Sequence, residues 1–179
     1  MIFEPFPDFL PAEYHVKFVT EEWERREAAL LRRKVFCDEQ KIFSGDDRDA
    51  VDDVAVLIVA LSSFAIVRQE VVGTVRIHEV EPGIWWGSRL AVAAGYRGIS
   101  ALGSSLIRLA VSSAHARGCR RFYAHVQSQN VPLFRRLNWE TVEEVVLHGR
   151  PHHFMRADLG HYPPIADAET GFLLLPKAA

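Results

Sequence analysis

The chain has 179 residues, of which 49% are hydrophobic and 25% are charged, and its formal net charge is −2. These values are typical of one compact globular domain with a hydrophobic core. No long block of like charge occurs, and the longest apolar stretches, residues 54–61 and 172–175, are far too short to cross a bilayer. Neither a nucleic acid nor a membrane is therefore expected as a partner.

The two cysteines, Cys37 and Cys119, lie far apart in the sequence. A disulfide framework needs more cysteines, and a zinc site needs close Cys or His spacing, so we predict two reduced core thiols. Residues 1–13 form a proline-punctuated lead-in that lacks the basic and apolar segments of a signal peptide. The expected location is the cytoplasm, and the expected organisation is this lead-in, a folded domain over 14–159 and a tail over 160–179.

The first half of the chain predicts a strand, a helix and then a β-rich region. Residues 14–19 alternate in the manner of a strand, and Thr20 offers an N-cap to an amphipathic helix over 21–36. An acidic loop over 44–53 follows the helix. Runs of β-branched and aromatic residues then predict strands over 54–60, 71–77 and 85–92, with 62–67 as a further candidate strand.

The second half alternates helices with strands. A turn signal at 95–98 precedes a strong helix over 102–117, and Gly118 ends that helix in a position suited to a left-handed cap. The remaining elements are a strand over 122–126, a short helix over 130–137, and strands over 141–147 and 153–158. Helices set between strands indicate an α/β fold, with a mixed sheet and helices on its faces.

The clearest chemical signal is the connection from the third long strand into the second strong helix. It contains Gly98 and Gly103, and Ser104 and Ser105 are expected in the first helical turn. Free backbone N–H groups at a helix start, beside small residues, make an anion site for which a pyrophosphate is the natural guest. Arg97 adds a positive charge. A tight connection built for geometry alone is the alternative, and neither the dinucleotide fingerprint nor the Walker motif is present.

Six segments, in the same order along the chain, resemble the GNAT acetyltransferases. The pair Tyr96-Arg-Gly and Leu102-Gly-Ser-Ser-Leu-Ile resembles their acetyl-CoA pyrophosphate loop. The other segments are Val35-Phe-Cys-Asp-Glu-Gln, Val72-Gly-Thr-Val-Arg, Gly87-Ser-Arg-Leu-Ala-Val, His125-Val-Gln with Pro132-Leu-Phe-Arg-Arg-Leu-Asn-Trp-Glu, and Gly149-Arg-Pro-His-His-Phe-Met. The resemblance covers about residues 14–159. It implies the GNAT fold, a mixed, mostly antiparallel twisted sheet flanked by helices.

The resemblance also implies an N-acetyltransferase that takes acetyl-CoA as co-substrate, uses no metal and acts on a small amine. Dimers are common in this family, so a homodimer is an open option. Backbone groups of the third long strand would hold pantetheine, the loop would hold pyrophosphate, and two residues of the short helix would line the channel near the thioester. The implied cofactor-binding residues are Leu90, Ala91, Val92, Arg97, Gly98, Ser100, Leu102, Gly103, Ser104, Asn130 and Phe134.

Two departures from the family pattern bear on function. The loop has one extra residue between Arg97 and Gly103, and Phe134 stands where many members have a tyrosine that protonates the leaving thiolate. Phenylalanine cannot donate a proton, although a thiol with a pKa of about 8.5 leaves tolerably as thiolate at neutral pH. Phe134 favours an alternative, a non-catalytic CoA-binding module. A third hypothesis is transfer of longer acyl chains, because the autoinducer synthases are similar in fold.

An amine acceptor with a pKa of about 10 must lose a proton before it attacks, so the reaction needs a base. The resemblance points to Glu39 and His152, because both lie in segments that line the acceptor side in similar enzymes. The structural alternatives are a surface carboxylate at a helix end and a strand-end histidine bonded to the backbone. A backbone N–H near 90–92 is expected to stabilise the oxyanion.

The remaining polar clusters do not predict a metal site. The loop over 46–53 lacks the glycine and terminal glutamate of a calcium loop, so it is either a solvated loop or an attraction for a cationic acceptor. His148, His152 and His153 could suggest zinc, but a glycine and a proline near them prevent helical ligand geometry.

Overall fold

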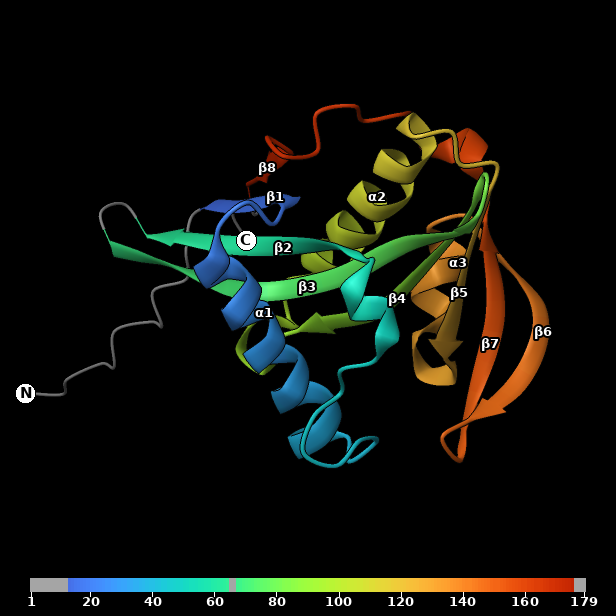
Figure 1. The fold of residues 1–179 in the computed structure, drawn as a ribbon, viewed down its shortest axis with the longest axis horizontal. Coiled ribbons are helices and arrows are strands. Elements are labelled where there is room, and N and C mark those ends of the chain that lie inside the picture. The colour runs from blue at the N-terminus through green and yellow to red at the C-terminus, as the bar shows by residue number, and fades with distance from the viewer. Residues whose placement is uncertain (1–12, 65–66, 176–179) are drawn as a thin grey trace, which may run out of the picture.

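Residues 13–64 and 67–175 are described in the computed structural model, so the predicted lead-in lies outside the described residues apart from Glu13. The described chain forms an eight-stranded sheet in the order β6-β7-β5-β4-β3-β2-β1-β8 (Figure 1). The strands are β1 (Glu13–Phe18), β2 (Val56–Phe64), β3 (Val67–Glu81), β4 (Ile84–Val92), β5 (Arg121–Gln127), β6 (Trp139–Leu147), β7 (Arg150–Ala157) and β8 (Phe172–Leu174). Only the β4–β5 pair is parallel among these strands, which confirms the mixed, mostly antiparallel sheet that the family resemblance implies.

Helices cover both faces of the sheet. They are α1 (Glu22–Arg33), α2 (Ser100–Ala116) and the short α3 (Val131–Arg136). Ala28 and Leu31 of α1 pack with Val59 and Leu61 of β2. The alternate β2 residue Ile58 packs with α2, so α1 and α2 lie on opposite faces, as the period of two in a strand requires. Figure 1 shows α1 crossing the front of β2 and β3.

The start and end of α1 differ from the prediction in detail. Thr20 is not the N-cap, because Glu21 takes that position and shares a capping box with Glu24. The buried Glu24 carboxylate also forms an ion pair with Lys17 at 2.8 Å. The α-helix ends at Arg33, and the chain continues as a π-helical turn over Lys34–Glu39. Such turns are frequent at functional sites, and this one leads directly into the cavity described below.

The sheet splits where its one parallel pair ends. β4 and β5 are paired from Ile84 to Gly87 and from Arg121 to Ala124, and the described pairing stops there. The two arrowheads point apart in Figure 1. Beyond these residues, the facing edges of β4 and β5 are no longer paired with each other, so their backbone groups face the gap between the two strands.

Two strand predictions need correction, and the tail can be placed. The candidate strand over 62–67 is wrong as a separate element, because its described residues are the end of β2 and the start of β3. The strand predicted over 71–77 is only the middle of the long β3. In the tail, β8 pairs with β1, and the buried Tyr162 hydroxyl accepts a hydrogen bond from the Trp139 indole at 2.9 Å. Residues 160–175 thus pack onto the domain.

Candidate functional site

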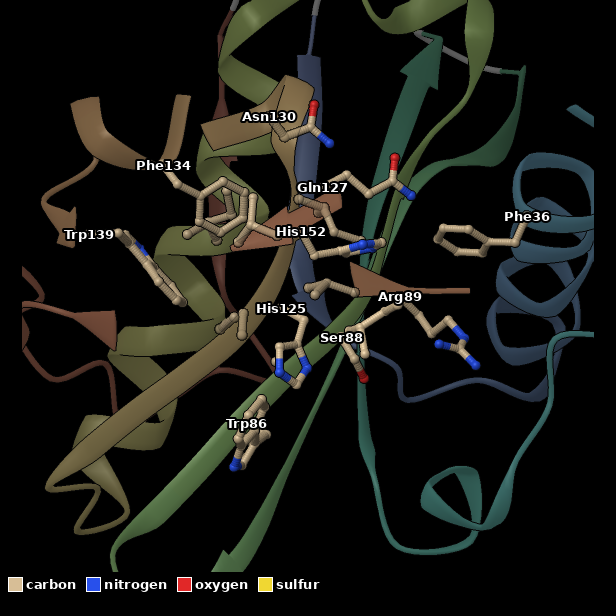
Figure 2. A pocket seen from close by; sticks show the side chains of 18 of the residues that line it. Phe36, Trp86, Ser88, Arg89, His125, Gln127, Asn130, Phe134, Trp139 and His152 are labelled. Atoms are coloured by element: carbon tan, nitrogen blue, oxygen red, sulfur yellow. The ribbon is translucent and has the colours of Figure 1, made fainter. Parts of the chain in front are cut away.

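Where β4 and β5 diverge, a cavity of about 270 Å³ opens through the sheet. It is lined by residues of β4 between Trp86 and Leu90 and of β5 between Phe122 and Gln127. The lining also includes Phe36 on the α1 side and Ile107 on the α2 side. Figure 2 shows the labelled side chains converging from these elements. The cavity therefore connects the two faces of the sheet, as a reaction between two separately bound substrates would require.

A β-bulge in β4 forms one wall of the cavity. Thr74 pairs with Ala91 and Arg76 with Ser88, so β4 has one residue more than β3 between these pairs. Arg89 lies in this bulge with a left-handed φ of 55°, a conformation that is strained for a residue with a side chain. A bulge leaves its extra residue outside the ladder. Neither Arg89 nor Leu90 therefore has a register partner in β3, and both lie at the cavity wall.

Carboxylates from the acidic loop hold the bulge in place. The Arg89 Nε atom donates to Asp47 Oδ2 at 3.0 Å, and a terminal nitrogen donates to the Asp47 carbonyl at 3.0 Å. Asp49 accepts a further bond at 3.2 Å, and the guanidinium lies 4.4 Å from the centre of the Phe43 ring. Because Asp47 is buried, these contacts fix the backbone at a position where no glycine relieves the strain.

The start of α2 leaves room for an anion close to the backbone. α2 begins at Ser100, two residues earlier than predicted, and Ile99 gives no side-chain cap. The free N–H groups of the first turn thus belong to Ser100 and Ala101, and the placement of Ser104 and Ser105 in that turn was wrong. A Cβ on Gly98 would meet nothing within 4 Å, and one on Gly103 would meet only Leu133, at 4.0 Å.

Other predicted loop residues have structural roles. The Leu102 side chain is fully buried in the core, and the Ser104 hydroxyl donates to the Ala101 carbonyl at 3.1 Å. Arg97 donates to the Val92 carbonyl at 3.0 Å and pairs with Glu39 at 2.6 Å. A residue predicted to bind phosphate and a residue predicted to act as base therefore contact each other. Neither of them lines the cavity.

His152 lies in β7 and projects into the cavity (Figure 2). Its side chain is buried, and its Nδ1 atom lies 2.9 Å from the Arg150 carbonyl oxygen. Because a carbonyl oxygen only accepts hydrogen bonds, Nδ1 carries a proton, and in the neutral ring Nε2 is the nitrogen that has the lone pair. Of the two predicted bases, His152 lines the cavity and has its tautomer fixed by the backbone.

The other predicted residues divide between the cavity and its surroundings. Leu90, Asn130 and Phe134 line the cavity. Ala91 and Val92 pair with β3 on one side, and their other edge is the one that β5 leaves.

The sequence model of the acetyltransferase (GNAT) family matches residues 12–139. The chain belongs to the GNAT acetyltransferase family. GNAT proteins use acyl-CoA donors. No curated protein matches the chain significantly in sequence.

Solved structures share the GNAT fold at low sequence identity. A Lactobacillus plantarum protein described as an N-acetyltransferase is 20% identical, with a TM-score of 0.69 over 80% of this chain and 97% of that one. Escherichia coli ElaA is 19% identical, with a TM-score of 0.66 over 81% and 98%. The CoA-dependent acyl-homoserine lactone synthase BjaI, solved with SAM and isopentyl-CoA, is 18% identical, with a TM-score of 0.65 over 81% and 83%.

Carboxylates of the acidic loop in this GNAT domain are neutralised by arginines from other elements. Arg32 binds Asp47 at 2.8 Å and Asp52 at 2.6 Å, and Arg76 binds Asp49 and Asp52 at 2.6 and 2.8 Å. Burial alone would raise the pKa of Asp52, but hydrogen bonds from Arg32, the Asp49 backbone and Arg76 hold that pKa far below its ordinary value. These aspartates act as a scaffold for the bulge, and their pairing weakens the idea that they attract a cationic acceptor.

Sequence reasoning missed an aromatic cluster beside the GNAT cavity, of which Trp86 and His125 line the cavity. Trp86 stacks on Phe154 with ring centres 5.4 Å apart, and its ring centre lies 4.9 Å from that of His125. Burial of the His125 ring, together with the nearby His152, lowers the pKa of His125, so its imidazole is neutral at pH 7. These residues come from three strands whose order in the sheet cannot be read from the sequence, so no local pattern brought them together.

No group of side chains in the described residues could hold a metal ion. No helix in the same part of the chain is long and apolar enough to cross a membrane.

Proposed function

We propose that this GNAT protein is an N-acyltransferase that transfers the acyl group of an acyl-CoA, such as acetyl-CoA, to a small amine. The observation that carries the proposal is the cavity itself, which combines the bulged backbone at Leu90 with the free Nε2 of His152. A donor site and a base on the two walls of one opening are what acyl transfer to an amine requires.

The described residues fit a CoA thioester. The open edge of β4 at 90–92 offers backbone hydrogen bonds to pantetheine, beside Asn130 and Phe134. The first turn of α2, with open space at Gly98, suits the pyrophosphate, as the fixed N–H groups of a helix start suit any anion. When bound, the thioester would supply an acyl carbon that is activated toward attack.

The residues around the thioester would then divide the work. His152 Nε2 accepts the proton that the amine must lose, directly or through one water. The N–H of the bulge at Leu90 stabilises the negative charge that develops on the thioester oxygen. Phe134 packs edge-on against Trp139, with ring centres 5.0 Å apart, and donates no proton. The thiol therefore leaves as thiolate, which its pKa of about 8.5 permits.

The alternative is a CoA-binding module without catalysis, which Phe134 favours. The cytoplasm is the location we propose for either function, because both described cysteines are buried and free, the state that a reducing compartment maintains.

A thiol-release assay over amino acids, polyamines and aminoglycosides distinguishes the acyltransferase from the non-catalytic module. S-adenosylmethionine is tested as a further acceptor because the structure of BjaI was solved with it. Thiol release with any acceptor excludes the non-catalytic alternative.

Binding of CoA is the first test of either function. CoA at about 100 times its Kd should raise the melting temperature by roughly 5–10 °C, because a ligand that binds only the native state stabilises it. Gly103→Glu should abolish this shift by placing a bulky anion at the start of α2. Ala166→Glu adds the same charge on an exposed loop and should keep it. A wild-type protein without any shift at millimolar CoA would refute both functions.

A further inference from the structure

The cavity extends well beyond the point where an acetyl group would end. In the proposed function the thioester oxygen lies at the bulge by Leu90, whereas the lining continues down β4 past Gly87 to Trp86. Three residues of a strand span roughly 10 Å. The methyl group of an acetyl lies only about 1.5 Å beyond the carbonyl carbon. An acetyl group would fill only the first part of this depth, and the rest is space that the acceptor and a longer acyl chain could share.

The deep end of the cavity is apolar. Five of its lining residues come from α2, β5 and β6 and are at most 4% exposed: Ile107, Ala110, Val111, Phe122 and Trp139. Figure 2 places Phe134 and Trp139 at one end, Phe36 and Arg89 at the other, and His152 between them. The charged guanidinium of Arg89 thus lies away from the deep end. A hydrocarbon chain is the ligand that such a wall favours.

Small side chains keep this space open. Ala110 and Ala124 stand on the two sides of the deep end, from α2 and β5. At Gly87 a Cβ would lie 3.1 Å from the Phe122 ring, a contact so tight that the ring would have to shift slightly. Larger residues at these positions would fill the cavity without removing the bulge or His152.

We propose, on the basis of the acyltransferase function above, that the donor carries a medium-length acyl chain that lies in this deep end. A cavity of about 150 Å³ lined by Leu, Ile and Phe holds benzene. The cavity of about 270 Å³ also serves the acceptor side, so it suits a chain of roughly four to eight carbons. The acyl length, rather than the CoA moiety, would then distinguish this donor from acetyl-CoA.

Titration calorimetry with a series of donors tests this without an identified acceptor. The ligands are CoA, acetyl-CoA, butyryl-CoA, hexanoyl-CoA, octanoyl-CoA and dodecanoyl-CoA. Kd should fall by up to about fourfold for each methylene that enters the cavity, and the fall should stop near eight carbons. Ala110→Leu should move this limit to shorter chains and Ile107→Ala to longer ones. Ala116→Leu, the same change on the exposed face of α2, should leave the limit in place.

The outcomes separate this inference from the function on which it depends. If CoA and acetyl-CoA bind and Kd is flat or rises with chain length, the medium-chain donor is refuted and the acyltransferase stands. If CoA itself does not bind, the acyltransferase function fails as well. The acyl length at which Kd stops falling should decrease in Ala110→Leu and increase in Ile107→Ala. If it does not move in these opposite directions, the placement of the acyl chain in the deep end is also refuted. A general loss of stability in a variant changes the Kd values of all donors by the same factor, so the ratio of Kd values between donors is unaffected by it.

Discussion

At the scale of single residues, the orientation of one imidazole favours His152 over Glu39 as the proposed base. His152 and Glu39 are both suited to the task by residue type. The Arg150 carbonyl fixes the His152 tautomer and leaves Nε2 free in the cavity, whereas Glu39 is paired with Arg97. A carboxylate in a 2.6 Å ion pair must give up that pairing to take a proton, which makes it the weaker choice.

His152→Gln should lower kcat about 100-fold at saturating acyl-CoA, because glutamine keeps hydrogen bonding but cannot take up the proton. The Kd for CoA should stay within a factor of two or so, since His152 lies on the acceptor side. His153→Gln is the matched control, because the neighbouring ring is bonded to the Thr141 hydroxyl and does not line the cavity. Steady-state kinetics with an acceptor from the thiol-release panel measures all three proteins. Unchanged turnover and an unchanged pH profile in His152→Gln would exclude it as the base.

At the scale of elements, β4 owes the shape of its cavity wall to a strained residue. Arg89 has a left-handed φ without being glycine, and the carboxylates of Asp47 and Asp49 hold it there. The strand therefore carries a bulge that its own sequence does not require. Its position depends on ion pairs with a loop about 40 residues earlier in the chain.

Comparing glycine with alanine at position 89 measures this strain. Both variants lose the ion pairs, but only alanine keeps the steric cost of a positive φ. Arg89→Gly should therefore be more stable than Arg89→Ala by about 1 kcal/mol in urea unfolding. At Ser88, which has no positive φ, the order should reverse, because glycine weakens a strand interior. Equal stabilities of the two variants at position 89 would show that the bulge is not strained.

At the scale of the whole molecule, a buried network of arginines and aspartates connects α1, β3, β4 and the acidic loop. Breaking such a network leaves charges uncompensated in the interior, which is costly even where the intact network adds little to stability. The network thus makes the fold sensitive to acid, since its aspartates must stay ionised.

Asp52→Asn should lower the free energy of unfolding by about 3 kcal/mol at pH 7. The pKa of Asp52 is held below its ordinary 3.8 in the folded state, so the unfolded chain takes up the proton first as the pH falls. The stabilisation is therefore present above pH 3.8 and is lost gradually as the pH falls further, so the difference between the wild type and the variant should begin to shrink below pH 3.8. Urea unfolding from pH 3 to 7 measures the difference. Asp53→Asn, which removes an exposed ion pair with Arg48, should cost less than about 1 kcal/mol throughout. A difference that stays constant down to pH 3 would contradict this account of Asp52.

Local features of the sequence determined most elements of this protein. The strands at 85–92, 122–126 and 141–147 and the helix that Gly118 ends were predicted within a few residues, because periodicity and turn chemistry act over short distances. The ordered segments around the pyrophosphate loop pointed to the family, which the family match confirmed. His152 and Leu90 were named as candidates by the same resemblance, although nothing local fixed their geometry.

Only the tertiary structure decided how the candidates meet. Arg97 and Glu39 are 58 positions apart, and their ion pair follows from where the π-helical turn meets the end of β4. The bulge at Arg89 contains no glycine that would have indicated it in the sequence. Contacts with Asp47 and Asp49 offset the backbone strain instead. The cavity exists because β4 and β5 pair for four residues and then separate. The ion pair, the bulge and the cavity depend on packing and charge interactions between residues far apart in the chain, and no local sequence pattern predicts such interactions.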